Sequence, residues 1–231
     1  MTHMPLIIGH RGCKYSGIRE NSKAAVERAV AEVADIVEID VTYTKCDRFL
    51  AYHYIAPGPI AAYVRRQYLR LRADVESVES LVRSLDSRKP LYLDIKERLT
   101  RETMARLLGI VRAYHKNSLI IGSFHIGVLQ YMQEWGQPCT INYHCYATSS
   151  AIATAAAVNA NWINPMPFGI RRSFVDSAIS RGLKFVPAGN ENDKKQLLYA
   201  DYGAYALSTF RPARLRSLLA RHINSFSSEA T

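Results

Sequence analysis

The feature that most constrains the fold is the alternation of two hydrophobic periodicities along the whole chain. Short apolar or β-branched runs, of the kind that form buried strands, recur at residues 6–9, 36–42, 91–96, 119–124, 140–144, 162–164, 184–188 and 205–208. Between them lie segments in which apolar residues return at intervals of three and four, as on one face of a helix. Examples are 26–33, 78–85 and 104–111.

Eight strands that alternate with helices in a chain of 231 residues predict a (β/α)8 TIM barrel of the α/β class. An open, doubly wound sheet is the alternative that the same alternation allows. Since no internal repeat, low-complexity tract or linker divides the sequence, we expect residues 1–231 to form a single domain. Asn21 or Ser22, and Thr100, are suited to cap helix N-termini, and Gly182 to end a helix over 173–181.

The connection 43–90 is much longer than the others, and it holds several distinct stretches. A further strand-like run at 49–53 is followed by the turn-prone APGP at 56–59 and by a basic, aromatic stretch at 61–72. A solvated helix surface is the commonest meaning of such a stretch. A lid that attracts an anionic headgroup or lipid surface is the second interpretation, and nucleic-acid contact is the third.

The chain has a formal net charge of +10, which suits a phosphorylated substrate, an anionic membrane surface or nucleic acid. Because no known nucleic-acid motif occurs, we expect no nucleic-acid partner. No apolar run approaches the roughly 18 to 20 residues of a membrane span, and the start lacks the features of a secretory signal, so we expect a cytoplasmic protein. Without CxxC spacing, the cysteines are expected to be free thiols: Cys13, Cys46, Cys139 and Cys145.

Charged side chains gather where the first three long predicted strands end: His10, Arg11, Glu38, Asp40, Asp94 and Lys96. Strand alternation places Glu38 and Asp40 on one face, and Asp94 and Lys96 on one face. In a TIM barrel the carboxyl ends of the strands meet at one mouth, so these groups should converge. Three carboxylates make an all-oxygen site for Mg²⁺ or Ca²⁺. The alternative is a salt-bridge network in which Arg11 and Lys96 neutralise the acids.

Several stretches occur in an order and at spacings that resemble the glycerophosphodiester phosphodiesterase family. They are IIGHRG at 7–12, EN at 20–21, VEIDVTYTK at 37–45, AYH at 51–53 and LYLDIK at 91–96. The resemblance implies a TIM barrel that hydrolyses small glycerophosphodiesters to an alcohol and glycerol 3-phosphate, with a bound divalent metal. By position it implies that Glu38, Asp40 and Asp94 bind one divalent cation, Mg²⁺ or Ca²⁺. The family usually has Glu where this chain has Asp94, which keeps the ligand type.

The resemblance also assigns roles to the basic side chains. It implies that His10 and His53 act as the general acid and base, and that Arg11 and Lys96 hold the substrate phosphate. This agrees with the chemistry, because a phosphodiester anion needs its charge offset and two imidazoles can exchange protons near neutral pH.

The sequence departs from the family after His53. Tyr54 stands where the family has Asp, and the segment between strands two and three is a reduced form of the insertion that the family carries. Two alternatives therefore accompany the main hypothesis. One is a lysophospholipase D or sphingomyelinase D type of enzyme, whose substrate carries an acyl chain, and the other is an inactive phosphoester-binding barrel. His125 and His144 belong to no motif, so we interpret both as hydrogen-bonded structural residues.

Overall fold

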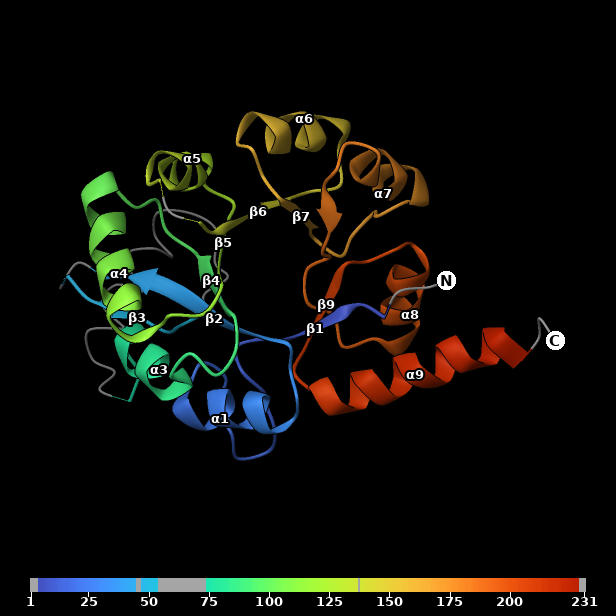
Figure 1. The fold of residues 1–231 in the computed structure, drawn as a ribbon, viewed down its shortest axis with the longest axis horizontal. Helices are drawn as coiled ribbons and strands as arrows, with labels where there is room; N and C mark the ends of the chain where they lie inside the picture. Colours follow the sequence, from blue (N-terminus) through green and yellow to red (C-terminus); the bar gives the residue numbers. More distant parts are fainter. Residues whose placement is uncertain (1–3, 45–46, 54–73, 137, 229–231) are drawn as a thin grey trace.

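The computed structural model describes residues 4–44, 47–53, 74–136 and 138–228 (Figure 1). Its strands are β1 (Leu6–Gly9), β2 (Ile36–Tyr43), β3 (Phe49–Leu50), β4 (Leu91–Ile95), β5 (Leu119–Ser123), β6 (Thr140–Cys145), β7 (Trp162–Pro165), β8 (Lys184–Phe185) and β9 (Ala206–Thr209). Its helices are α1 (Lys23–Ala31), α3 (Val78–Leu85), α4 (Arg101–Tyr114), α5 (Ile126–Glu134), α6 (Ser149–Ala157), α7 (Arg172–Ile179), α8 (Asp193–Asp201) and α9 (Pro212–Ser228).

Eight of the strands form a parallel sheet in the order β8-β7-β6-β5-β4-β2-β1-β9. The backbone N–H of Tyr205 donates to the carbonyl of Phe185 at 2.8 Å, which links the two ends of this order. Figure 1 shows the helices arranged around the outside of the nearly closed ring of strands. The prediction of a (β/α)8 barrel is therefore confirmed, and the open doubly wound alternative is wrong.

The barrel buries apolar side chains in two layers, one outside the strands and one inside them. The outer layer packs the β2 residues Ile39 and Val41 against helical residues such as Leu81 and Leu107. The inner layer fills the lumen with one cluster of side chains from the strands and from the residue after β8: Ile8, Ile36, Tyr92, Ile120, Trp162, Val186 and Ala206. Because strand side chains alternate between these layers, the inner-facing residues nearest the strand ends are left to line a mouth.

Helix boundaries follow the predicted signals in most places. The side chains of Ser22 and Thr100 accept hydrogen bonds from the first turns of α1 and α4, as N-caps do. Asn21 is not the cap; it lies at φ +53° and its side chain reaches Asp40 instead. Gly182 follows α7 at φ +78°, in the left-handed region where glycine is favoured.

The long connection after β2 is described only in part. Its strand-like run at 49–53 forms the short β3, which pairs antiparallel with β2. Tyr54, the APGP turn, the basic stretch 61–72 and most of the reduced insertion lie outside the described residues. Within the described ranges, no helix is long and apolar enough to cross a membrane.

Candidate active site

The sharp turn after β1 places His10 and Arg11 at the mouth of the barrel. Arg11 and Gly12 both have positive φ angles, +54° and +73°. A Cβ atom on Gly12 would lie 2.5 Å from the backbone carbon of Ala25, so only glycine fits against α1. The backbone N–H of Arg11 donates to Glu38 Oε2 at 2.6 Å, which joins the turn to β2.

The three predicted acids, Glu38, Asp40 and Asp94, come together on two neighbouring strands. In the parallel pairing of β2 with β4, Asp40 lies directly opposite Asp94. Each acid offers one carboxylate oxygen, and these oxygens lie within 4.8 Å of one another. Glu38 is 3 % exposed and Asp40 is fully buried, so their charges require compensation inside the protein.

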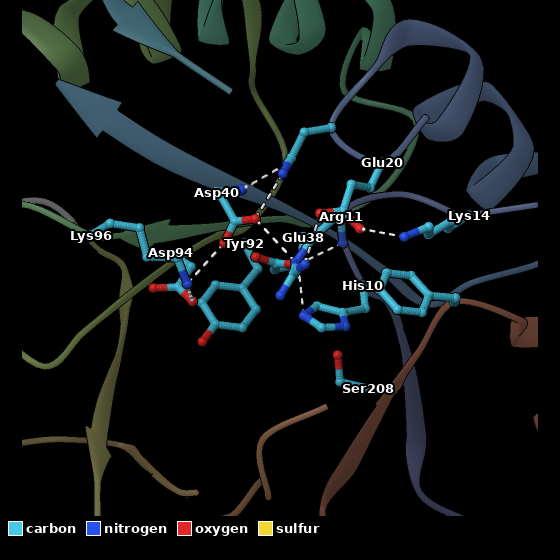
Figure 2. Close-up of polar contacts among 12 residues, drawn as sticks. His10, Arg11, Lys14, Glu20, Glu38, Asp40, Tyr92, Asp94, Lys96 and Ser208 are labelled. Atoms are coloured by element: carbon cyan, nitrogen blue, oxygen red, sulfur yellow. Dashed lines mark hydrogen bonds and ion pairs between the residues drawn. The ribbon is translucent and has the colours of Figure 1, made fainter. Parts of the chain in front are cut away.

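Cations supply part of that compensation, and they act mainly on Asp40 (Figure 2). Arg11 Nε lies 3.1 Å from Asp40 Oδ2, and Lys96 Nζ lies 2.8 Å from Asp40 Oδ1. Asn21 Nδ2 also donates to Asp40 Oδ2 at 2.7 Å. Burial by itself raises the pKa of Asp40, but the charges of Lys96 and Arg11 outweigh it and lower that pKa overall. Lys96 also forms an ion pair with Asp94. The salt-bridge network considered from the sequence is thus present around Asp40.

Glu38 and Asp94 each have one carboxylate oxygen that accepts no hydrogen bond from the described residues. Glu38 Oε1 and Asp94 Oδ1 are both buried and have no hydrogen-bond partner among the described residues. Burial, followed by the charges of Asp40 and Asp94, raises the pKa of Glu38 well above its usual value. Buried carboxylate oxygens without donors are a suitable environment for a hard divalent cation. The donor set therefore fits the cation predicted from the sequence.

His10 and His53 face the same cavity as the acids. His10 Nε2 lies 4.0 Å from Glu38 Oε2, and the ring stacks on Phe210 with centroids 4.8 Å apart. Burial, together with the charge of Arg11, lowers the pKa of His10 to about 3. Burial likewise lowers the pKa of His53 to about 4. Both imidazoles are therefore neutral near pH 7 and able to accept a proton.

The cavity at the mouth has a volume of about 440 Å³. One part of its lining is charged and comes from the loops and strands β1, β2 and β4. The other part comes from the ends of β5, β6 and β7. It contains the polar residues His125, His144 and Asn164 and a larger apolar set: Phe124, Tyr146, Met166, Pro167 and Phe168. Six of the seven predicted site residues line this cavity, and Asp40 lies buried directly beneath it through its contacts with Arg11 and Lys96.

A chain of hydrogen-bonded side chains crosses the lumen, and the sequence did not predict it. Asn142 Nδ2 donates to the hydroxyl of Tyr92 at 2.8 Å, and that hydroxyl lies 2.5 Å from His144 Nε2. We assign the hydroxyl proton to Nε2, because the hydroxyl oxygen already accepts from Asn142; in this tautomer the proton of the neutral ring lies on Nδ1, which is 3.5 Å from Asp94 Oδ1. Burial lowers the pKa of His144, which agrees with a neutral ring.

The expectation for His144 was correct in one respect and incomplete in another. The residue is hydrogen-bonded, as predicted, but it also lines the cavity and faces a predicted metal ligand. Strand alternation could have indicated this chain of hydrogen bonds. Tyr92 lies two positions before Asp94 and Asn142 two positions before His144, so the members of each pair share one face of their strand. His125 also lines the cavity, and its Nε2 lies 3.2 Å from the carbonyl of Lys96.

The described cysteines are free thiols, as predicted. Cys13, Cys139 and Cys145 form no disulfide, and Cys46 lies outside the described residues. Burial raises the pKa of Cys13 to about 12, so this thiol is a poor nucleophile despite its closeness to the turn after β1. We therefore assign it no part in the site.

Comparison with known proteins identifies the fold. No protein-family model matches the chain, and no curated protein matches it. A glycerophosphodiester phosphodiesterase structure from Parabacteroides distasonis covers 95 % of this chain and 98 % of its own, with a TM-score of 0.79 at 17 % identity. The chain has the fold of glycerophosphodiester phosphodiesterases.

Two further solved structures show the same likeness. A phosphodiesterase from Oleispira antarctica, in complex with the product sn-glycerol-3-phosphate, has a TM-score of 0.78 at 17 % identity and covers 94 % of this chain and 97 % of its own. A glycerophosphodiester phosphodiesterase from Thermotoga maritima has a TM-score of 0.70 at 18 % identity, with coverage of 94 % and 99 %. The family resemblance noted in the sequence is thus confirmed at the level of the fold.

Proposed function

We propose that this protein is a metal-dependent phosphodiesterase that hydrolyses glycerophosphodiesters to an alcohol and glycerol 3-phosphate. The observation that carries the proposal is the convergence of a buried carboxylate cluster and two neutral imidazoles at one barrel mouth. Active sites of TIM barrels are built at this end of the strands. The likeness to phosphodiesterase structures, one of them holding sn-glycerol-3-phosphate, supports the same reaction.

Glu38, Asp40 and Asp94 would hold the divalent cation, Mg²⁺ or Ca²⁺. The unpartnered oxygens of Glu38 and Asp94 favour this assignment, and Lys96 already bridges Asp40 and Asp94 as a protein cation. When bound, the metal would offset the charge of the phosphodiester and polarise a phosphoryl oxygen.

Arg11 and Lys96 would hold the phosphate. Both line the cavity, and both are anchored from behind by carboxylates, Arg11 by Glu20 and Asp40, and Lys96 by Asp40 and Asp94. A cation held in this way keeps its position without reorganisation when charge develops on the phosphoryl group. A guanidinium is well matched to phosphate oxygens because it presents several N–H donors in one plane.

His10 and His53 would exchange protons with the substrate. One imidazole takes the proton of the attacking hydroxyl, which belongs either to water or to the neighbouring carbon of the glycerol, as a new P–O bond forms. In the second case a cyclic phosphate forms first, and water then opens it by the same proton transfers to give glycerol 3-phosphate. The other imidazole, protonated in the substrate complex, gives its proton to the leaving oxygen as the old P–O bond breaks. The anionic phosphate favours that protonated state, because a nearby opposite charge raises the pKa of a histidine.

The direct test is a substrate panel. Glycerophosphocholine and glycerophosphoethanolamine are incubated with the protein and Mg²⁺, Ca²⁺ or a chelator, and released glycerol 3-phosphate is measured. We expect release only with a divalent cation. Substitution of His10→Gln or His53→Gln should lower the rate by about 10² to 10⁴. His222, which pairs with Asp201 far from the mouth, provides the control His222→Gln, and this variant should retain the wild-type rate. Absence of release from every substrate with every ion would exclude the proposal.

A further inference from the structure

The imidazole of His10 packs against two residues that the proposed reaction does not otherwise use. Phe210, directly after β9, stacks on the ring with centroids 4.8 Å apart and an interplanar angle of 21°. Gly189, in the loop after β8, lies so close that a Cβ atom there would stand 2.7 Å from His10 Nδ1. We call Phe210 and Gly189 the His10 support. Both are distant from His10 in the sequence, so the closed barrel brings them to the ring.

Glu191 holds the Phe210 side of the support in place. Its carboxylate accepts the backbone N–H of Phe210 at 2.8 Å through Oε1 and the hydroxyl of Thr209 at 3.1 Å through Oε2. The carbonyl of Thr209 in turn accepts the backbone N–H of His10 at 2.9 Å. The backbones of His10 and Phe210 are thus joined through Thr209, and their rings meet in a defined geometry.

Gln196 holds the Gly189 side of the support. Its side chain is 3 % exposed, and its Nε2 donates to the carbonyls of Asn190 and Ser208. Ser208 belongs to β9, so these bonds tie the loop after β8 to the strand that precedes Phe210. Breaking either bond would leave a polar group unpaired in the interior, which is costly. The position of Gly189 beside His10 is therefore stabilised.

Phe210 acts on the cavity only through its neighbours. It is half-buried and is absent from the described residues that line the cavity, whereas His10 and Gly189 are among them. The guanidinium of Arg11 and the ammonium of Lys14 lie 5.8 and 5.7 Å from the centroid of its ring. These contacts attach the ring of Phe210 to the turn after β1. Its stacking partner in that turn is His10.

The support takes the place of the hydrogen bond that usually orients a reactive histidine. In most such residues a hydrogen bond from one ring nitrogen sets the direction of the other. Among the described residues, neither ring nitrogen of His10 has a hydrogen-bond partner, since Glu38 Oε2 at 4.0 Å from Nε2 is too distant. Nδ1 lies against the backbone of Gly189 instead. Packing therefore sets the direction in which Nε2 points.

We propose that Phe210 is a positioning residue for His10. Its ring, with the backbone of Gly189, holds the imidazole so that Nε2 points into the cavity and exchanges the proton there. This inference rests on the proposed function, which makes His10 one of the two groups that exchange protons. Proton transfer depends steeply on alignment, so a ring that is free to take other rotamers should lower kcat. Arg11 and Lys96 would still bind the phosphate, so KM should change little.

Two substitutions test the support in different ways. Phe210→Leu removes the stacking ring. Gly189→Ala displaces the imidazole, because the three atoms nearest to the added Cβ all belong to His10. Each variant should lower kcat for glycerophosphocholine by about ten- to a hundredfold, with KM within about twofold of the wild-type value. Phe210→Tyr keeps an aromatic ring and should keep most of the wild-type kcat.

Matched controls lie on α4, outside the mouth. Tyr114→Leu removes a half-buried ring that stacks with Arg83 at 3.9 Å, and Gly109→Ala adds a Cβ that would meet no atom within 4 Å. Both should keep the wild-type kcat. An equal fall in kcat in Phe210→Leu and Tyr114→Leu would show a general effect of losing a ring, and it would overturn the proposal.

Proton NMR of the metal-free protein reads the position of the ring without turnover. The Cε1–H signal of His10 is identified by its absence in His10→Gln. It should lie upfield in the wild type, because the stacked ring of Phe210 shields it. The signal should move downfield in Phe210→Leu and stay in place in Phe210→Tyr. A signal that does not move in Phe210→Leu would overturn the proposal.

The two readouts separate this inference from the proposed function. If diesters are cleaved with a normal kcat in both Phe210→Leu and Gly189→Ala, only the positioning role is wrong. A rise in KM with an unchanged kcat would assign Phe210 to substrate binding and would also contradict the proposal. If the wild type cleaves no diester while the NMR signal moves as expected, the proposed function fails and the support of His10 by Phe210 is confirmed.

Discussion

The two halves of the barrel mouth differ in how their side chains are held. On the side of β1, β2 and β4, Asp40 is buried and contacts Arg11, Asn21 and Lys96 at once. On the side of β5, β6 and β7, the side chains of Tyr146 and Phe168 are mostly exposed to solvent. A reaction at a charged group is helped by protein charges that are held in place in advance. Contact with an apolar group needs only exposed apolar area, because apolar contacts have no preferred direction. Under the proposed function, the reaction takes place in the first half, and the second half is free to contact the rest of the substrate.

The largest effect is expected from removing the central charge of the first half. Asp40→Asn leaves Arg11 and Lys96 without their shared buried partner, so the free energy of unfolding should fall by about 3 to 5 kcal/mol. Urea denaturation of the metal-free protein measures this. The control is Asp47→Asn, whose ion pair with Arg106 is exposed and screened by water, so that its loss should lower the free energy of unfolding far less. An equal fall in the free energy of unfolding of both variants would show that the buried ion pairs of Asp40 stabilise the protein no more than a surface ion pair does.

Lys96 tests the charged half further, because its ammonium group competes with a divalent cation for the carboxylates of Asp40 and Asp94. In Lys96→Gln no ammonium bridges Asp40 and Asp94, so calorimetry should show divalent-cation binding about tenfold tighter. The same variant should lose about 10² in kcat/KM, because a cation that stabilises the phosphate is gone. Lys184, at the opposite end of the barrel, supplies the control Lys184→Gln. A Lys96 variant with weaker metal binding and normal turnover would contradict both assignments.

Tyr92 and His144 connect the two halves, since His144 contacts Phe124 on one side and faces Asp94 on the other. Tyr92→Phe removes the hydroxyl that orients His144, so the affinity for the divalent cation should fall by about tenfold. Tyr199→Phe alters a buried tyrosine that packs on Phe185, outside the mouth, and serves as the control. Unchanged affinity in Tyr92→Phe would limit the chain of hydrogen bonds to a structural role.

The pH dependence of stability tests the protonation state of the two histidines in the first half. His10 and His53 have pKa values of about 3 and 4 because burial disfavours their charged forms. The unfolded state therefore binds more protons once the pH falls below about 6.5, and stability is lost as the pH decreases toward those values. Glu38, whose pKa is raised, contributes with the opposite sign. The metal-free wild type should lose up to about 1.4 kcal/mol per pH unit more than His10→Gln between pH 6 and 5. Parallel curves for the two proteins would contradict a buried neutral His10.

The sequence predicts the charged half of the mouth better than the aromatic half. Glu38 and Asp40 stand two positions apart in a strand-like run, so alternation and the end of the strand already place them together. The aromatic half offers no such pattern, because Phe124, Tyr146 and Phe168 each follow a different strand and line one cavity only when the barrel closes. The pairing of Tyr92 with His144 depends in the same way on β4 and β6, which are separated by another strand.

Smaller differences between the predicted and the observed strands and helix caps have local causes. Lys184–Phe185 is shorter than the predicted strand at 184–188, although the N–H groups of Val186 and Ala188 still donate to the carbonyls of Ile163 and Pro165 on β7. Asn21 was one of two candidates for the cap of α1. Ser22 is the cap because the side chain of Asn21 is bonded to Asp40 instead. Asn21 Nδ2 donates to Asp40 Oδ2, and Asn21 Oδ1 accepts from the backbone N–H of Asp40.

The proposed reaction depends on a divalent cation held by Glu38, Asp40 and Asp94. Crystals soaked in Mn²⁺, with diffraction data collected at an energy where manganese scatters anomalously, test this most directly. We expect one strong anomalous peak within bonding distance of oxygens from all three carboxylates, and we expect this peak to be absent in Glu38→Gln. A mouth without a peak, with Lys96 still bridging Asp40 and Asp94 at saturating Mn²⁺, would contradict it.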